Sequence, residues 1–209
     1  MKICITLDDV LRGKTAQFGK IYKKYIDDSV DLDKIDLSSG DLCKVFFNGD
    51  SKKYEKFLYE DYAFEIFSEA QPAEKMVDKN LILWHLDVAE DEDIDYDVEL
   101  MLGNAREFNA SIGYTYFFIS KMATRIREVY LPKDSLELWE KCDIMVTADP
   151  YLLQNKPEGK VSIKIETDYN KDDDADYTYG SLQKFIDDKD NFKKIMTELH
   201  NQSNGQEEN

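Results

Sequence analysis

The chain begins MKICITLDDVLRGKT, in which a short β-rich stretch, residues 2–7, leads into the acidic pair Asp8 and Asp9. Carboxylates at the end of a buried strand are suited to general acid–base work and to holding Mg²⁺, which prefers oxygen ligands. Thr6, at the end of this stretch, offers a hydroxyl where a carboxylate would be expected. A threonine hydroxyl is largely un-ionised at neutral pH, and no histidine stands near it in the sequence to take its proton.

Three later stretches also have the composition of buried strands: GYTYFFIS at 113–120, CDIMVTADP at 142–150 and VSIKIET at 161–167. Helical patterns separate them, and strands that alternate with helices predict a parallel α/β sheet. In open parallel sheets the functional site lies beyond the carboxyl ends of the strands. This rule selects Thr6–Val10, Ser120–Lys121, Thr147–Asp149 and the loop after Thr167.

The first two predicted strands are separated by much more chain than one crossover helix needs. We therefore predict a helical cap insertion at 13–109, an α/β core formed by 1–12 and 110–200, and a flexible C-terminal tail at 201–209. Apolar residues at helical spacing predict the individual helices. These are expected at 14–27, 51–70, 73–87, 97–109, 121–130 and 134–141, with an amphipathic helix from about 179.

The order of these strand ends resembles the haloacid dehalogenase-like (HAD) superfamily, and most closely its 5'(3')-deoxyribonucleotidase-type branch. In that family the first strand ends in Asp-x-Asp, where the first aspartate is the nucleophile and the second is the general acid/base. The resemblance places Thr6 at the nucleophile position and Asp8 at the acid/base position. It implies further site positions at Ser120 for the second motif, Lys133 or Lys141 for the third, and Thr147, Ala148, Asp149 and Pro150 for the fourth.

The departures from the family pattern predict a loss of catalysis. The resemblance implies a nucleophilic carboxylate and Mg²⁺-binding acids, but Thr6, Thr147 and Ala148 occupy those positions. Losing charge at two places that face one metal removes most of the attraction for Mg²⁺. In the other register Asp8 would be the nucleophile, and Val10, which cannot carry a proton, would stand at the acid/base position. Loop acids that cap a helix remain an alternative reading of Asp8 and Asp9.

The net charge and the cysteine content limit which partners and which cellular compartment we expect. The chain has 209 residues and a formal net charge of −17, so its field has the wrong sign for nucleic acid or an anionic membrane. Its three cysteines, Cys4, Cys43 and Cys142, are scattered without metal-binding spacing and indicate reduced thiols of an intracellular protein. No stretch approaches the length of a membrane span, and the N-terminus does not have the pattern of a signal peptide.

These observations favour a catalytically inactive HAD-like domain that serves as a structural or interaction protein without a cofactor. The expected partners are proteins of a larger assembly, with basic surfaces. The Tyr-, Asn-, Asp- and Lys-rich composition resembles that of bacteriophage proteins from AT-rich genomes. This resemblance implies a virion component of the tail or neck-ring region, located in the host cytoplasm and in the particle. Two alternatives remain open: a Mg²⁺-dependent phosphatase or nucleotidase acting on a small phosphate ester, and a module that holds a nucleotide or phosphate through Ser120, Lys121 and backbone N–H groups.

Overall fold

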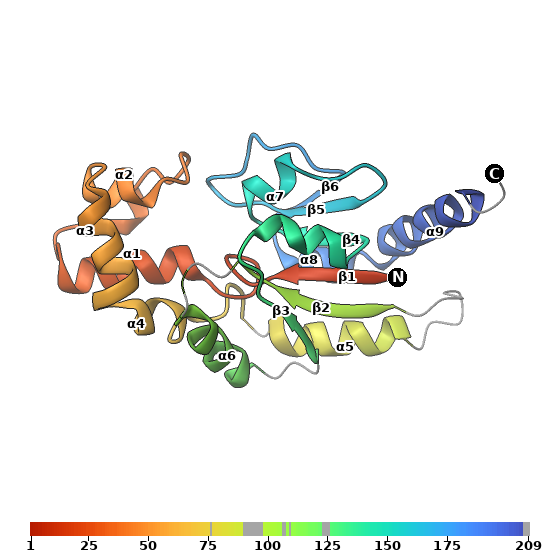
Figure 1. The fold of residues 1–209 in the computed structure, drawn as a ribbon, viewed down its shortest axis with the longest axis horizontal. Helices are drawn as coiled ribbons and strands as arrows, with labels where there is room; N and C mark the ends of the chain where they lie inside the picture. The colour runs from red at the N-terminus through yellow and green to blue at the C-terminus, as the bar shows by residue number, and fades with distance from the viewer. Residues whose placement is uncertain (76, 90–97, 106–107, 109, 123–125, 207–209) are drawn as a thin grey trace.

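A parallel β-sheet forms the centre of the computed structural model, which describes residues 1–209 apart from 76, 90–97, 106–107, 109, 123–125 and 207–209 (Figure 1). In the described residues the sheet has six strands in the order β3-β2-β1-β4-β5-β6, and every neighbouring pair is parallel. The strands are β1 (Lys2–Thr6), β2 (Glu99–Gly103), β3 (Glu128–Tyr130), β4 (Ile144–Thr147), β5 (Val161–Ile165) and β6 (Tyr177–Tyr179). The expected parallel α/β fold and the strands predicted at 2–7, 142–150 and 161–167 are confirmed.

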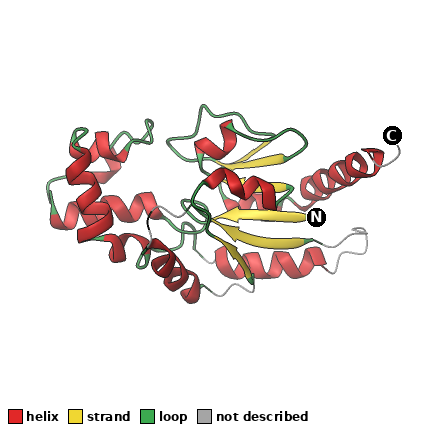
Figure 2. Cartoon of the chain, in the orientation of Figure 1, coloured by secondary structure: helices red, strands yellow, loops and turns green. Residues whose placement is uncertain are grey.

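Helices pack on the sheet (Figure 2), and apolar side chains on both of its faces explain this burial. Along β1, Ile3 and Ile5 point to one face and Cys4 points to the other, as the two-residue period of a strand requires. The Ile3 face packs against α5 (Val77–Ala89), α8 (Leu182–Asp187) and α9 (Lys189–Gln206). The Cys4 face packs against the 3-10 helix η3 (Ser135–Lys141) and α7 (Pro150–Gln154).

A helical cap follows β1, as expected, and has its own aromatic core around Phe18, Phe46 and Phe57. Its elements are α1 (Lys14–Tyr25), the 3-10 turn η1 (Leu32–Lys34), α2 (Leu42–Phe47), α3 (Ser51–Glu55), the π-helix η2 (Lys56–Asp61) and α4 (Ala63–Phe67). In Figure 1 this cap extends from the end of the sheet to which the β1 arrow points. The cap therefore lies beyond the carboxyl ends of the strands.

Two short linkers join the cap to the sheet domain, and they are hydrogen-bonded to each other. The Gly13 N–H donates to Gln71 O at 3.0 Å, and the Ala73 N–H donates to Leu11 O at 2.9 Å. Arg12 and Pro72 form an antiparallel bridge between these two bonds. The chain thus leaves the sheet domain and returns to it at one place.

Two predicted elements are wrong in type. Residues 97–109 were expected to form a helix but include strand β2. Residues 113–120 were expected to form a strand but belong to helix α6 (Ser111–Lys121). The apolar run in α6 buries Thr115 and Phe118 but leaves Tyr116 and Phe117 exposed, so it packs on one side only. Because β2 pairs with β1 from Glu99 to Gly103, the sheet includes a segment that was assigned to the cap.

The structure also differs from the predictions for residues 121–130 and for the C-terminal segment. The helix expected at 121–130 is wrong over its last residues, which form β3; residues 123–125 lie outside the described part. Helix α9 extends to Gln206 and so includes most of the segment 201–209 that was expected to be a flexible tail, while 207–209 are not described. Among the described residues no helix is both long and apolar enough to span a membrane.

Candidate functional site

The ends of β1 and β4 meet through two threonine side chains. Thr6 and Thr147 are buried, and the Thr6 hydroxyl lies 3.1 Å from Thr147 Oγ1. Thr147 Oγ1 also accepts the backbone N–H of Asp149 at 3.0 Å. Both hydroxyls are therefore used inside the protein, at the two strand ends where the family resemblance implies charged metal ligands.

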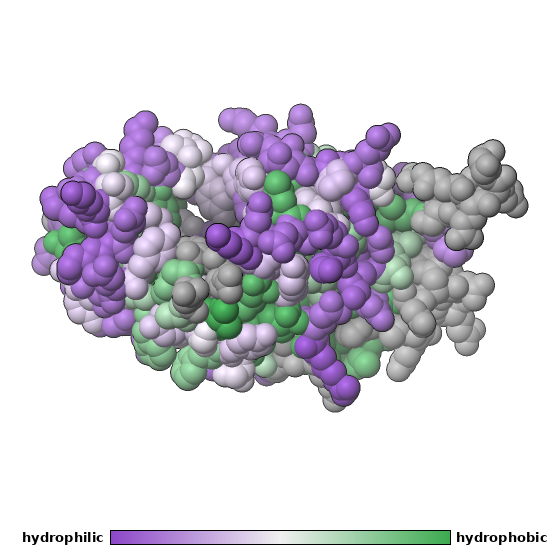
Figure 3. Space-filling model, in the orientation of Figure 1, coloured by the Kyte–Doolittle hydropathy of each residue, from purple (hydrophilic) through white to green (hydrophobic). Residues whose placement is uncertain are grey.

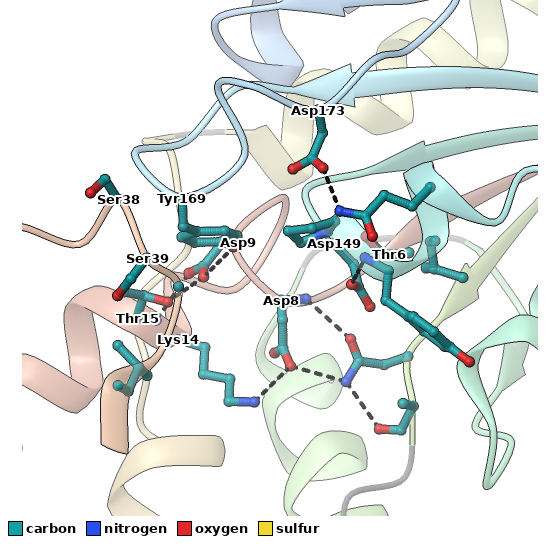
Figure 4. A pocket seen from close by; sticks show the side chains of 18 of the residues that line it. Thr6, Asp8, Asp9, Lys14, Thr15, Ser38, Ser39, Asp149, Tyr169 and Asp173 are labelled. Atoms are coloured by element: carbon teal, nitrogen blue, oxygen red, sulfur yellow. Dashed lines mark hydrogen bonds and ion pairs between the residues drawn. The ribbon is translucent and has the colours of Figure 1, made fainter. Parts of the chain in front are cut away.

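Asp8, the predicted acid/base residue, is surrounded by hydrogen-bond donors (Figure 4). Its Oδ1 lies 2.6 Å from Nη2 and 2.7 Å from Nε of Arg12. Its Oδ2 accepts Lys14 Nζ at 3.2 Å and Asn104 Nδ2 at 3.1 Å. Burial alone would raise the pKa of Asp8, but the charges of Arg12 and Lys14 outweigh it and lower this pKa to about 2. The side chain is thus a fixed carboxylate at neutral pH.

Asp9 joins the start of the cap to the loop that follows β5. It has a left-handed backbone conformation with φ 57°, which aspartate tolerates better than most residues. Its carboxylate accepts the Thr15 N–H at 3.0 Å, the Thr15 hydroxyl, and the Tyr169 hydroxyl at 2.9 Å. Burial raises the pKa of Asp9. Burial and the adjacent Asp9 charge raise the pKa of Tyr169, so the phenol stays a proton donor.

Asp149 caps the helix that follows β4. Its Oδ1 accepts the Tyr151 N–H at 2.8 Å, and Pro150 occupies the first position of α7. Burial raises the pKa of Asp149, the helix N–H groups oppose this effect, and the negative charge of Asp8 adds to it. The residue thus serves as a helix N-cap at the edge of the site.

The loop after β5 is held by two buried polar side chains. Lys164 donates to the backbone oxygens of Asn170 and Asp173 at 3.2 and 2.6 Å, and also to that of Lys171. Asn170 donates to Ala148 O and Ile165 O at 3.0 and 2.9 Å. These bonds satisfy buried groups that would otherwise cost free energy, and they fix the loop that carries Tyr169.

These side chains border a cavity of about 680 Å³ between the strand ends and the cap. Its lining comes from the core and from the cap, with Ser38, Ser39 and Tyr54 on the cap side. The charged lining residues are Asp8, Asp9, Asp149, Asp172, Asp173 and Lys14. Because carboxylates dominate this set and Lys14 pairs with Asp8, the field in the cavity opposes the entry of a phosphate group.

The structure brings Thr6, Asp8, Thr147 and Asp149 together but places the other predicted site residues elsewhere. Ser120 is exposed on α6 and donates to Phe117 O at 2.7 Å. Lys121 donates to Ser68 O and lies over the Phe117 ring. Lys133 and Lys141 are exposed, and Lys141 lies 5.8 Å from the centre of the Tyr130 ring. Ser120 does not lie at a strand end because 113–120 belongs to helix α6.

Two residues at the site were missed from the sequence. Asn104 directly follows β2 and exchanges hydrogen bonds with Asp8. Recognition of 99–103 as a strand would have identified it. Lys14, the first residue of α1, lies at the site and forms an ion pair with Asp8. Its spacing of six residues from Asp8 gave no recognisable motif.

The residues at the strand ends do not fit the Mg²⁺ ion that the HAD resemblance implies. A magnesium site usually includes one or two carboxylates, whereas Thr6 and Thr147 are neutral and hydrogen-bonded to each other. Both Asp8 oxygens are already engaged by cations or an amide. In the part of the chain that the structure describes, no group of three or more His, Cys, Asp or Glu side chains is arranged to hold a metal ion.

Comparison with known proteins does not assign the chain to a family. No protein-family model matches the sequence. No curated protein matches it either. Among solved structures, a haloacid dehalogenase-like hydrolase from Burkholderia xenovorans LB400 is similar, with a TM-score of 0.47 and 9% sequence identity. The match covers 90% of this chain and 95% of that one. The six parallel strands and the helical insertion after β1 form the α/β architecture that the sequence predicted.

Proposed function

We propose that this protein is a catalytically inactive HAD-like domain that works as a structural component and binds other proteins in an assembly. The observation that carries the proposal is the contact between Thr6 and Thr147, which joins two strand ends by a 3.1 Å hydrogen bond between neutral side chains. A virion component of the tail or neck-ring region remains the setting that the sequence composition favours.

The chemistry of phosphoryl transfer explains why this contact matters. In the HAD family that the sequence resembles, an aspartate attacks phosphorus and forms an acyl-phosphate as the ester P–O bond breaks and the alcohol leaves, while a metal ion offsets the charge of the transferring group. Thr6 is buried, its hydroxyl is hydrogen-bonded, and no base stands beside it among its described contacts. Asp8 has a low pKa and two cationic partners, so it is poorly suited to deliver a proton near neutral pH.

Exposed aromatic side chains on the outer surface support an interaction role. Phe64 of α4 and Tyr116 and Phe117 of α6 are 41%, 49% and 46% exposed, and the rings of Phe64 and Phe117 lie 5.4 Å apart. Figure 3 shows apolar residues in this part of the surface, with hydrophilic residues around them. Aromatic residues are enriched at protein interfaces, and a net charge of −17 favours a partner with basic groups.

The catalytic part of the proposal is tested by Mg²⁺ binding and turnover. We expect MgCl₂ to change the melting temperature no more than NaCl of equal ionic strength, because only a ligand of the native state stabilises it specifically. We also expect no hydrolysis of p-nitrophenyl phosphate or nucleoside 5'-monophosphates. Mg²⁺-dependent turnover that disappears in Asp8→Asn would overturn the proposal and establish the phosphatase alternative.

The assembly part is tested by incorporation into particles. In phage particles purified from a lysate that produces this chain, we expect mass spectrometry to detect it at a fixed ratio to the other virion proteins. The double variant Phe64→Ser/Phe117→Ser should be depleted from the particles while it keeps the wild-type circular dichroism spectrum. Leu83→Ser, which changes a 60% exposed apolar residue on α5, is the matched control and should be incorporated normally. A chain that is absent from the particles and remains monomeric would contradict this part.

A further inference from the structure

Arg12 is a fully buried arginine at the junction between the sheet domain and the cap. Its side chain has 0% exposure, and its Cζ lies 5.5 Å from the centre of the Phe67 ring and 5.6 Å from that of Phe118. Burial of a guanidinium is costly unless a counter-ion and hydrogen bonds compensate for the lost water. The buried charge of Arg12 is therefore tolerated only because other groups form an ion pair and hydrogen bonds with it.

Those partners come from three different parts of the molecule. Asp8, in the loop after β1, provides the counter-ion at 2.6 Å. Phe67 O, at the end of α4 in the cap, accepts Nη1 at 3.1 Å, and Thr115 Oγ1 of α6 accepts the same nitrogen at 3.3 Å. One side chain thus ties the loop at the strand end to the last residue of the cap helices and to α6.

The backbone of Arg12 lies at the same junction. The bridge between Arg12 and Pro72 connects the two linkers through which the cap is attached, with Gly13–Gln71 and Leu11–Ala73 hydrogen bonds beside it. A rotation of the cap relative to the sheet requires these linkers to bend. The side-chain bonds of Arg12 hold both sides of this hinge at once, because Asp8 belongs to the outgoing chain and Phe67 to the returning chain.

We propose that Asp8 and Arg12 form a hinge lock, in which the carboxylate at the family's acid/base position acts as the counter-ion that fixes the cap to the sheet domain. Lys14 and Asn104 hold the second oxygen of Asp8 and so keep the carboxylate in place for Arg12. This explains why an aspartate is useful at position 8 when the strand end beside it has no nucleophile. The inference rests on the proposed function only in that Asp8 has a structural and not a proton-transfer role.

The lock is tested by hydrogen–deuterium exchange of the linker amides, read from peptides that cover Gly13 and Ala73. In Asp8→Asn, we expect these amides to exchange about tenfold faster than in the wild type, since Arg12 loses its counter-ion. Asp143→Asn is the matched control because it breaks the Asp143–Lys160 ion pair, which lies within the sheet domain at 3.2 Å. Its linker amides should exchange at the wild-type rate.

A second variant keeps the test decisive if Asp8→Asn fails to fold. Asp8→Asn/Arg12→Met removes both charges and leaves a shorter, unbranched apolar side chain near Phe67 and Phe118; buried ion pairs often tolerate replacement by apolar residues. This double variant should fold and still show about tenfold faster linker exchange, because methionine cannot hydrogen-bond to Phe67 O or Thr115. For a second measurement, spin labels are attached at Lys53→Cys in the cap and Lys171→Cys in the sheet domain, in a Cys43→Ser background. The distance distribution between the labels should be broader in the double variant than in the same labelled chain with Asp8 and Arg12 intact.

Wild-type exchange rates together with a wild-type distance distribution in the double variant would overturn the lock and reduce Arg12 to a space-filling residue. This readout is independent of activity. Phosphatase turnover by the wild type would contradict the proposed function but would not change the exchange result. If the double variant shows wild-type exchange and distances, the hinge lock is wrong even when the wild type has no turnover.

Discussion

Arg12 and Lys14 lower the pKa of Asp8 to about 2, and this shift has a consequence for stability at acid pH. Its pKa in the folded protein lies below its ordinary value, so folding is favoured when the group is ionised. The stabilisation is fully present above about pH 4 and is lost as the pH falls through the folded pKa. A difference of about 2 pKa units corresponds to about 2–3 kcal/mol.

We therefore expect the difference in unfolding free energy between the wild type and Asp8→Asn to be constant from about pH 7 to about pH 5 and to shrink toward about pH 2. Urea unfolding at a series of pH values measures this difference. The raised pKa values of Asp9 and Asp149 act on both proteins, so subtraction largely removes their contribution. A difference that stays constant down to about pH 2 would show that the Arg12 and Lys14 charges do not lower the pKa of Asp8.

Asp149 has a structural role that a pair of substitutions can separate from its charge. Asparagine caps helices about as well as aspartate and removes the negative charge near Asp8, whereas alanine removes the cap. We expect Asp149→Ala to lose about 1 kcal/mol of unfolding free energy and Asp149→Asn to stay within about 0.5 kcal/mol of the wild type. Equal losses in the two variants would mean that the charge of Asp149, and not its cap, stabilises α7.

The sequence identified the residues at the ends of β1 and β4 because each stands directly after a recognisable apolar strand. Adjacent parallel strands bring their carboxyl ends together, so Thr6, Asp8, Thr147 and Asp149 could be grouped without a structure. Side chains that reach the site from other elements could not be found this way. Arg12, for example, contacts Phe67 and Thr115, and no local pattern in the sequence indicates which residues will surround a buried guanidinium.

Among the elements, β2 shows how close packing limits a central strand. Gly103 pairs with Thr6 of β1, and an added Cβ would lie 2.6 Å from Cys4 Sγ and 2.8 Å from Leu138 Cδ2. We expect Gly103→Ala to lose about 1–3 kcal/mol of unfolding free energy through overpacking. Gly113→Ala is the matched control because Gly113 is exposed in α6 with no atom within 4 Å of the added Cβ. It should gain up to about 1 kcal/mol from helix propensity. A Gly103→Ala protein as stable as the wild type would show that β2 and η3 can move apart.

The exchange of strand and helix between 97–109 and 113–120 has a physical cause. Continuous apolar runs fit a strand buried on both faces, but the aromatic run in α6 is divided between a buried side and an exposed side. In β2 the buried stretch Leu100–Gly103 is short, and an Ala-, Leu-, Met- and Glu-rich surrounding favours a helix on local propensity. Pairing with β1 and β3 overrides that propensity, and such long-range pairing is invisible in a local pattern.

At the scale of the whole molecule, the fold combines separate hydrophobic clusters with a strongly acidic surface. The cap has its own aromatic cluster around Phe18 and Phe57, while a larger cluster joins the sheet to α5, α8 and α9. Each part buries its own core, and aromatic contacts between α4 and the α6 region, such as Phe64–Tyr114, connect the parts together with the linkers and the polar contacts of Asp8, Asp9 and Arg12. Composition predicted the acidic surface, but it could not predict which aromatic and polar contacts would join the parts.

The net charge of −17 predicts how salt affects the stability of the entire protein. Like charges on a folded chain repel each other, and added salt screens this repulsion over a Debye length of about 8–10 Å near physiological ionic strength. Partly buried pairs such as Asp8 and Arg12 are screened much less, so the surface repulsion should dominate the response. We expect the melting temperature to rise by about 2–4 °C between about 10 and 200 mM NaCl, equivalent to about 1 kcal/mol for a chain of this size. KCl at equal ionic strength is the control and should give the same curve. A melting temperature that falls with salt would mean that surface ion pairs, such as Lys156–Asp176, contribute more to stability than the excess of negative charge costs.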